Sequence, residues 1–149
     1  MFSKSAEYYD IIYSSFKDYQ NEVKILSELI NGIHPNANSI LDVACGTGEH
    51  ARLFHSEYGY NVDGIDLDEG LLEVARRKNP DAKFTKANMT SFDLRRKYDV
   101  VMCLFSSIGY VQTLENVTKT LNSFKDHLSD NGIIIVEPWF PPNGWEPGK

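Results

Sequence analysis

The most informative part of the sequence is the run Ser39-Ile40-Leu41-Asp42-Val43-Ala44-Cys45-Gly46-Thr47-Gly48. It starts with apolar residues typical of a buried strand, carries an acid near the strand end, and finishes in a glycine-rich turn. Gly46 and Gly48 lack a Cβ atom, so the backbone can turn tightly there and a ligand can lie against it. The N–H groups of a helix that opens at Glu49 would face the same place. The run therefore predicts a strand, a cofactor-binding turn and a helix.

Asp42 separates two classes of cofactor. Gly46, Gly48 and Ala51 satisfy the spacing of a dinucleotide-binding loop, and Asp66 follows at the interval of a ribose-binding acid. However, a carboxylate shortly before the first glycine would repel a pyrophosphate, and it suits a ligand with a cationic amine and no phosphate. S-adenosylmethionine is such a ligand. A dinucleotide-binding domain of the NAD-dependent oxidoreductase type is the alternative that rests on the same glycines.

The segment from Leu41 to Gly48 resembles motif I of the class I S-adenosylmethionine-dependent methyltransferases. Three further segments resemble a narrower group, the N,N-dimethyltransferases of nucleotide-linked amino sugars such as those of desosamine and mycaminose biosynthesis. These segments are Tyr8-Tyr9-Asp10, Cys103-Leu104-Phe105-Ser106-Ser107-Ile108-Gly109-Tyr110 and Val136-Glu137-Pro138-Trp139-Phe140. The resemblance implies methyl transfer from S-adenosylmethionine to an amine of a nucleotide-linked amino sugar. A cofactor-binding module without turnover is a further alternative.

Apolar runs alternate with helical patterns along the chain, which predicts an α/β fold with a doubly wound, mainly parallel sheet. We expect the strand order 3-2-1-4-5, with the cofactor at the carboxyl ends of the strands. The expected strands are 39–44, 61–66, 83–87, 98–104 and 133–137. The expected helices are 49–58, 69–78 and 114–128, the last with an apolar stripe, taken as core packing, at Leu114, Val117, Leu121, Phe124 and Leu128.

We expect a single methyltransferase domain over residues 1–149, with an N-terminal helical cap at 1–37 and a Rossmann-like core at 38–137. A helix is predicted from Asp18 to Asn31, ended by Gly32. The aromatic residues before and within its start either pack on the sheet edge or close over the cofactor, as N-terminal helices do in the resembling family. After residue 137 a proline-rich run can hold no helix. Since the family continues there with a helix and antiparallel strands, we expect a C-terminally truncated fragment.

The predicted cofactor residues follow from the resemblance and from the strand ends. They are Tyr9, Tyr19, Asp42, Ala44, Gly46, Gly48, Asp66, Leu67, Asn88, Met89 and Leu104. Asp42 and the carbonyl group of Ala44 are expected to face the amino group of the cofactor; the alternative is that Asp42 only caps the turn.

The remaining cofactor contacts concern the nucleoside part. Asp66 is expected to accept hydrogen bonds from both ribose hydroxyls, Leu67 to cover the adenine, and Asp68 to cap the next helix. Asn88-Met89 resembles the family's adenine-contacting Asp-Met pair, with the acid replaced by Asn88. The alternative for Asn88 is a turn-forming residue.

Two residues are predicted at the reacting end of the site. Tyr110 stands where the resembling enzymes have a histidine, and its ordinary pKa of about 10 makes it a poor general base at neutral pH. It would position the amine, or simply pack on a helix start. Glu137 would orient a cationic or hydroxylated acceptor. The Asn/Asp-Pro-Pro-aromatic motif of base N-methyltransferases is missing after the fourth strand, which argues against nucleic-acid bases as acceptors.

Composition supports a small-molecule enzyme. A net charge of −6 at pH 7 disfavours nucleic-acid binding, which depends on Lys and Arg at phosphates. No apolar run approaches the ~20 residues that span a bilayer. We therefore predict a cytoplasmic protein, with no membrane partner. The two cysteines and four histidines lack metal-site spacing, so no metal is expected. A small-molecule acceptor is the expected partner, and a homodimer is left open.

Overall fold

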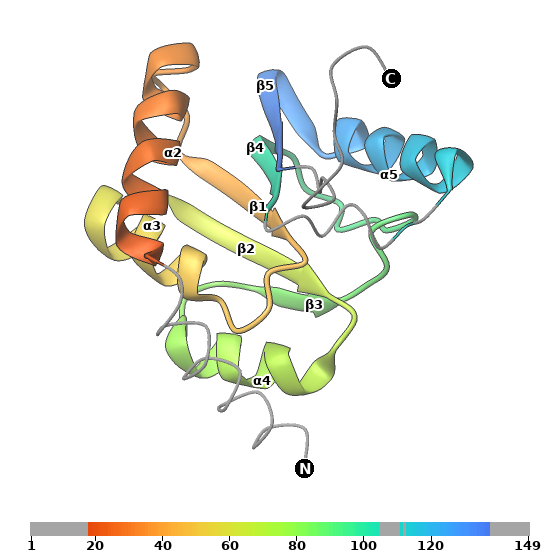
Figure 1. Cartoon of the computed structure of the whole chain (residues 1–149), viewed down its shortest axis with the longest axis horizontal. Coiled ribbons are helices and arrows are strands. Elements are labelled where there is room, and N and C mark those ends of the chain that lie inside the picture. Colours follow the sequence, from red (N-terminus) through yellow and green to blue (C-terminus); the bar gives the residue numbers. More distant parts are fainter. Residues whose placement is uncertain (1–17, 105–110, 112, 138–149) are drawn as a thin grey trace, which may run out of the picture.

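The computed structural model describes residues 18–104, 111 and 113–137. Its centre is a five-stranded sheet in the order β3-β2-β1-β4-β5 (Figure 1). The strands are β1 Ser39–Val43, β2 Asn61–Asp66, β3 Phe84–Lys86, β4 Tyr98–Cys103 and β5 Leu128–Val136. Every neighbouring pair of strands is parallel. The predicted fold class and strand order are confirmed, and all carboxyl ends of the strands meet at one edge.

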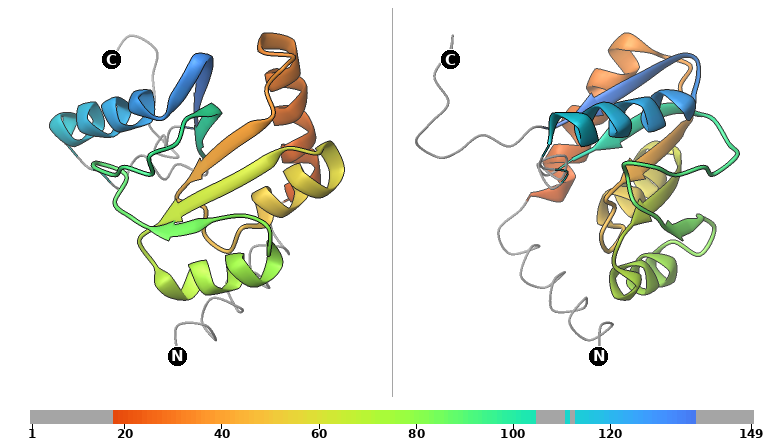
Figure 2. Two further views of the ribbon diagram at one scale, coloured as in Figure 1. Left: turned by 180° about the vertical axis from the view of Figure 1, so that it is seen from behind. Right: turned by 90° about the vertical axis from the view of Figure 1, so that its right-hand side faces the viewer.

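Helices cover both faces of this sheet (Figure 2). They are α2 Tyr19–Ile33, α3 Glu49–Tyr58, α4 Glu69–Lys78 and α5 Leu114–Asp126. Side chains alternate along β1, so that Ile40 packs with α2, α3 and α4, whereas Leu41 packs on the opposite face with Phe124 of α5. Among the helices described, none is long and apolar enough to cross a bilayer.

The start and end signals of the helices are largely where the sequence predicts them. Asp18 and Asp68 cap α2 and α4 by accepting backbone N–H bonds, and Thr113 does the same for α5. The predicted end of α2 was wrong. Gly32 does not end α2, because the helix continues to Ile33 and is capped at His34.

The predicted bounds of α5 and β5 were also wrong. The helix α5 ends at Asp126 rather than at residue 128, and β5 begins at Leu128, well before the predicted residue 133. The predicted apolar stripe on α5 is only partly core, because Leu114 is 83% exposed and Leu121 is 40% exposed. The buried side chains of α5 are Thr120, Ser123 and Phe124.

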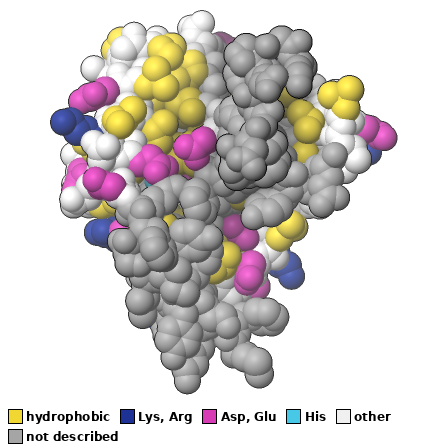
Figure 3. Space-filling model, in the orientation of Figure 1, with side chains coloured by type: hydrophobic (Ala, Val, Ile, Leu, Met, Phe, Trp, Pro, Cys, Tyr) yellow, Lys and Arg dark blue, Asp and Glu magenta, His cyan; other side chains and the backbone are white. Residues whose placement is uncertain are grey.

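Hydrophobic side chains also reach the surface on the outer side of α2. Ile25, Leu29 and Ile33 follow one another at intervals of one helical turn and are 56%, 46% and 60% exposed. Figure 3 shows hydrophobic side chains gathered over the part of this face that carries α2.

Candidate cofactor site

The turn after β1 is built from alternating backbone conformations. Ala44, Gly46 and Gly48 all have positive φ, at 61°, 57° and 76°. Glycine adopts such angles without strain, whereas alanine does so rarely. The turn is held by two backbone bonds: the Cys45 N–H donates to Ile65 O at 3.0 Å, and the Gly48 N–H donates to Cys45 O at 3.1 Å. A compact loop therefore stands at the carboxyl end of β1, as the glycine pattern predicts.

Asp66 connects this turn with the end of β2. Its Oδ2 accepts the Gly46 N–H at 2.9 Å, and its Oδ1 accepts the Asp68 N–H at 2.9 Å. Asp68 in turn accepts N–H bonds from Gly70 and Leu71, so its predicted role as the cap of α4 is confirmed. The structure brings Asp66 and the glycine turn together, as a ribose-binding acid beside a cofactor loop requires.

Asp42 lies inside the protein rather than at its surface. It is 2% exposed and shares its face of β1 with Ile40. Burial raises the pKa of the nearby Cys45 thiol well above its ordinary value, and the carboxylates of Asp42 and Asp66 raise it further. Cys45 is therefore a neutral thiol, and negative charge gathers behind the turn.

The end of β2 packs closely against the same turn. A Cβ atom added to Gly64 would lie 2.7 Å from the Cys45 sulfur and 2.9 Å from Cδ1 of Phe84. The missing side chain at Gly64 therefore lets β2 approach the turn.

The start of α2 reaches the start of α3 at this site. The Tyr19 ring lies 5.0 Å from the His50 ring in an edge-on arrangement, and His50 Nε2 lies 2.9 Å from Oε1 of Glu22. The predicted cofactor residue Tyr19 thus contacts the first turn of α3, which directly follows the glycine turn. Tyr9 lies outside the described residues.

The other predicted cofactor residues lie in three loops. Leu67 is 60% exposed directly after Asp66, and Leu104 is buried at 5% exposure. Asn88 Oδ1 accepts bonds from both the N–H and the hydroxyl group of Thr90, at 3.0 and 2.8 Å. Asn88 therefore forms a turn, and its contact with the adenine stays a prediction. Met89 is partly buried against the core cluster that contains Phe124 of α5.

The predicted catalytic residues lie after β4 and β5. Tyr110 is outside the described residues. Glu137 is exposed, and its N–H donates to Cys103 O at 3.0 Å, which places it beside the end of β4. Among the described residues, no group of three His, Cys, Asp or Glu side chains is arranged to hold a metal ion.

Two residues that contact the turn or follow it were not predicted from the sequence. Asn79 donates through Nδ2 to the Gly48 carbonyl at 3.1 Å, and Glu49 pairs with Arg52 and Lys78. The Asn-Pro pair at 79–80 is a helix-stop signal, but nothing in the sequence indicates that Asn79 contacts a loop 31 residues earlier.

The comparisons with known proteins agree with this geometry. The family described as a methyltransferase domain matches residues 40–132. The chain is 40% identical over 145 residues to the dTDP-3-amino-3,4,6-trideoxy-alpha-D-glucopyranose N,N-dimethyltransferase of Streptomyces venezuelae, covering 94% of this chain and 61% of that protein.

Solved structures of sugar-modifying enzymes are similar over the same region. DesVI of Streptomyces venezuelae superimposes with a TM-score of 0.87 at 39% identity, over 97% of this chain and 61% of DesVI. The S-adenosylmethionine-bound amino pentose methyltransferase CalS10 of Micromonospora echinaspora gives 0.84 at 29% identity, over 95% of this chain and 60% of CalS10. The chain thus spans about 60% of the length of these relatives. It belongs to the methyltransferase domain family.

Proposed function

We propose that this chain binds S-adenosylmethionine at the carboxyl edge of the sheet and serves methyl transfer to the amine of a nucleotide-linked amino sugar. The observation that carries the cofactor part is the Asp66 carboxylate, hydrogen-bonded to the Gly46 N–H at 2.9 Å. The substrate part is supported by 40% identity to a dTDP-amino-sugar N,N-dimethyltransferase.

The residues present fit this cofactor. Gly46 carries no side chain, so a ligand can approach the backbone of the turn there, and its positive φ of 57° suits glycine. Asp66 is held by two backbone N–H groups, so its carboxylate is fixed in place, and each oxygen keeps a second lone pair for a ribose hydroxyl. The buried Asp42 contributes negative charge that favours a cationic amino group over a pyrophosphate.

We assign the remaining site residues the roles that the resemblance implies, with a turn-forming role for Asn88. Tyr9 and Tyr19 bind the cofactor, the Ala44 carbonyl accepts from the cofactor's amino group, and Leu67 lies against the adenine. Met89 and Leu104 complete the apolar side, and Asn88 shapes the adenine loop through its turn.

When bound, S-adenosylmethionine supplies an activated methyl group on a sulfonium. The protein's task is then to align donor and acceptor and exclude water, because methyl transfer to an amine needs no nucleophilic side chain. Tyr110 and Glu137 position the acceptor amine, which must be neutral to attack. We expect the rate to rise with pH through the acceptor's own pKa.

The test is a mass-spectrometric assay of the gene product with S-adenosylmethionine and nucleotide-linked 3- and 4-amino sugars, with hydroxylated sugars and simple amines as comparison. We expect a mass gain of one or two methyl groups on the amino sugar. Methylation restricted to a hydroxyl or carbon acceptor would exclude the amine proposal. Binding of S-adenosylmethionine without turnover on any of these acceptors would make this chain a cofactor-binding module.

The partner, the cellular location and the oligomeric state are further proposals. We expect a small-molecule partner rather than nucleic acid, and a cytoplasmic location. A homodimer is tested by light scattering of the purified protein.

A further inference from the structure

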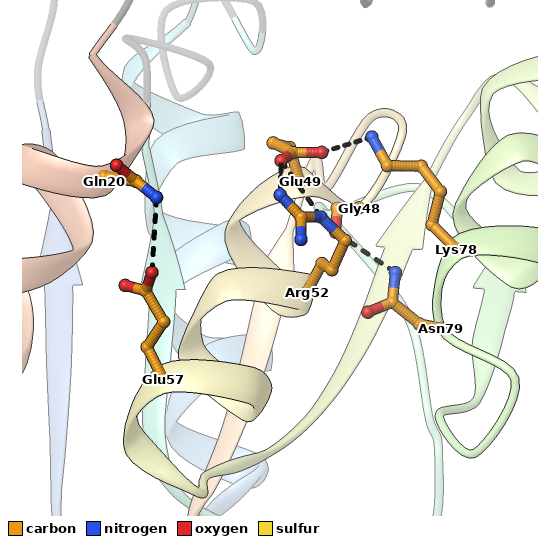
Figure 4. Close-up of polar contacts among 7 residues, drawn as sticks. All are labelled: Gln20, Gly48, Glu49, Arg52, Glu57, Lys78 and Asn79. Carbon is orange, nitrogen blue, oxygen red and sulfur yellow. Dashed lines mark hydrogen bonds and ion pairs between the residues drawn. The ribbon is translucent and has the colours of Figure 1, made fainter.

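The end of α4 lies directly behind the cofactor turn (Figure 4). Asn79, the residue that follows α4, is 8% exposed, and its side-chain amide donates to the carbonyl groups of Gly48 at 3.1 Å and of Ala75 at 3.0 Å. The Gly48 carbonyl also accepts the first helical bond of α3, from the Arg52 N–H at 2.9 Å. One buried amide thus joins the end of α4, the turn and the start of α3.

The fit between α4 and the turn is close. A Cβ atom at Gly48 would lie 2.7 Å from Nδ2 of Asn79 and 3.0 Å from the Cβ atom of Ala75. Gly48 is therefore required for two reasons, its positive φ of 76° and the proximity of α4. The turn is shaped by α4 as well as by its own sequence.

A charged contact reinforces this arrangement from the solvent side. Glu49 accepts two hydrogen bonds from the guanidinium group of Arg52, and its second oxygen pairs with Lys78 Nζ (Figure 4). Burial acts to raise the pKa of the Glu49 carboxyl, but the bonds from Arg52 and Lys78 outweigh it and lower that pKa below its ordinary value. The contact is therefore ionic at neutral pH, and it links Lys78 of α4 to the first residue of α3.

On one side of these contacts the packing is incomplete. A cavity of about 420 Å³ borders the same place, and its lining includes Arg52, Lys78, Asn79 and Ala82. Since space lies on that side, the polar bonds of Asn79 and Lys78 to the turn and to α3 are not backed by close packing there.

We propose that Asn79, Lys78 and Glu49, here named the α4 clamp, are positioning residues that hold the cofactor turn in its binding shape. Asn79 acts through the Gly48 carbonyl, and the ion pair of Glu49 acts through the start of α3. The inference rests on the proposed binding of S-adenosylmethionine at this turn.

The test is calorimetric titration of residues 1–149 with S-adenosylhomocysteine. Asn79→Ala removes the donor to both carbonyl groups, and we expect it to weaken binding about tenfold, the usual effect of losing a buried hydrogen bond. Asn79→Asp should weaken binding more, because a carboxylate cannot donate and would face two carbonyl oxygens. Lys78→Gln should have a smaller effect, because Arg52 still pairs with Glu49.

Glu57→Ala is the matched control. It removes the 3.3 Å contact between Gln20 and Glu57, which involves the same helix α3 at its other end (Figure 4). We expect unchanged affinity. All titrations are made at a temperature where circular dichroism shows every variant to be folded, so that lower stability alone does not change the affinity.

A second measurement does not need the ligand. Hydrogen exchange at the amides of Gly48 and Arg52 should become about tenfold faster in Asn79→Ala and stay unchanged in Glu57→Ala. If Asn79→Ala matches wild type in both affinity and exchange, the α4 clamp is wrong and the proposed function stands. If wild type does not bind S-adenosylhomocysteine, the proposed function fails, while the exchange rates still show whether Asn79 holds the turn.

Discussion

Asp66 holds the backbone together at the position where it is also proposed to contact a ligand. Its two oxygens hold the Gly46 N–H and the Asp68 N–H, so the glycine turn and the start of α4 share one carboxylate. A side chain fixed in this way loses little conformational freedom when a ligand binds, which favours affinity.

Asp66→Ala is therefore expected to weaken S-adenosylhomocysteine binding by a factor of ten or more. Hydrogen bonds to a charged acceptor contribute about 1.5–3 kcal/mol each, and about 1.4 kcal/mol corresponds to tenfold. The measurement is calorimetric titration. Asp68→Ala is the control, since it removes only the cap of α4. Loss of this cap should lower the free energy of unfolding by about 1 kcal/mol and leave the affinity for S-adenosylhomocysteine unchanged. Equal affinity losses in both variants would mean that Asp66 acts only through the fold.

Gly46→Val is expected to abolish or weaken binding by more than tenfold for a different reason. Gly46 has a φ of 57°, which a β-branched residue rarely adopts. The turn must distort to accept valine. Titration of the folded variant measures this, and an affinity equal to that of wild type would remove the turn from the proposed site.

The sequence predicted helices and strands well where their bounds depend on local signals. The bounds of α3, α4 and β2 were predicted correctly, because apolar periodicity and caps such as Asp68 are local signals. The stripe on α5 failed at Leu114 and Leu121, because whether an apolar side chain is buried depends on which elements cover it. The contact from Asn79 to Gly48 was equally inaccessible, since it depends on how α4 packs.

At the amino-terminal end of the sheet, the side chain of Asp99 joins neighbouring strands. The Asp99 carboxylate accepts the N–H groups of Asn38 and Ser39 and the hydroxyl group of Ser129, joining β1, β4 and β5. Burial acts to raise the pKa of Asp99, but the bonds from Asn38, Ser129 and Ser39 outweigh it and hold that pKa below its ordinary value.

This lowered pKa gives a pH dependence of stability. When the native pKa lies below the unfolded value, the carboxylate stabilises the fold above the unfolded pKa of about 3.9, and this contribution disappears as the pH falls through the native pKa. The free energy of unfolding should therefore fall more steeply below pH 4 in wild type than in Asp99→Asn. Urea titrations at pH 6, 4 and 3 measure it. Asp130→Asn, at an exposed aspartate, should keep the wild-type slope.

At the scale of the molecule, the two ends of the sheet differ. At the amino end, Asp63 accepts the Tyr98 hydroxyl at 2.8 Å, the Arg96 guanidinium at 2.8 Å and the Lys83 N–H at 2.9 Å, so its carboxylate joins β2 to β4 and to the residue before β3. At the carboxyl end the strands lead into loops, including the glycine turn. A ligand at this end would connect loops that leave different strands and would stabilise the whole sheet.

S-adenosylhomocysteine should accordingly raise the melting temperature of residues 1–149. A ligand that binds only the native state at 100 times its Kd adds about 2.7 kcal/mol. For a chain of this size, about 2–4 °C per kcal/mol gives a shift of roughly 5–11 °C. Differential scanning fluorimetry with S-adenosylhomocysteine and NADH in parallel makes the comparison. Gly46→Val should show a smaller shift than wild type at the same ligand concentration, because its turn is distorted and binds the ligand more weakly. A shift with NADH and none with S-adenosylhomocysteine would instead assign the glycine turn to a dinucleotide, despite the buried carboxylate of Asp42 beside it.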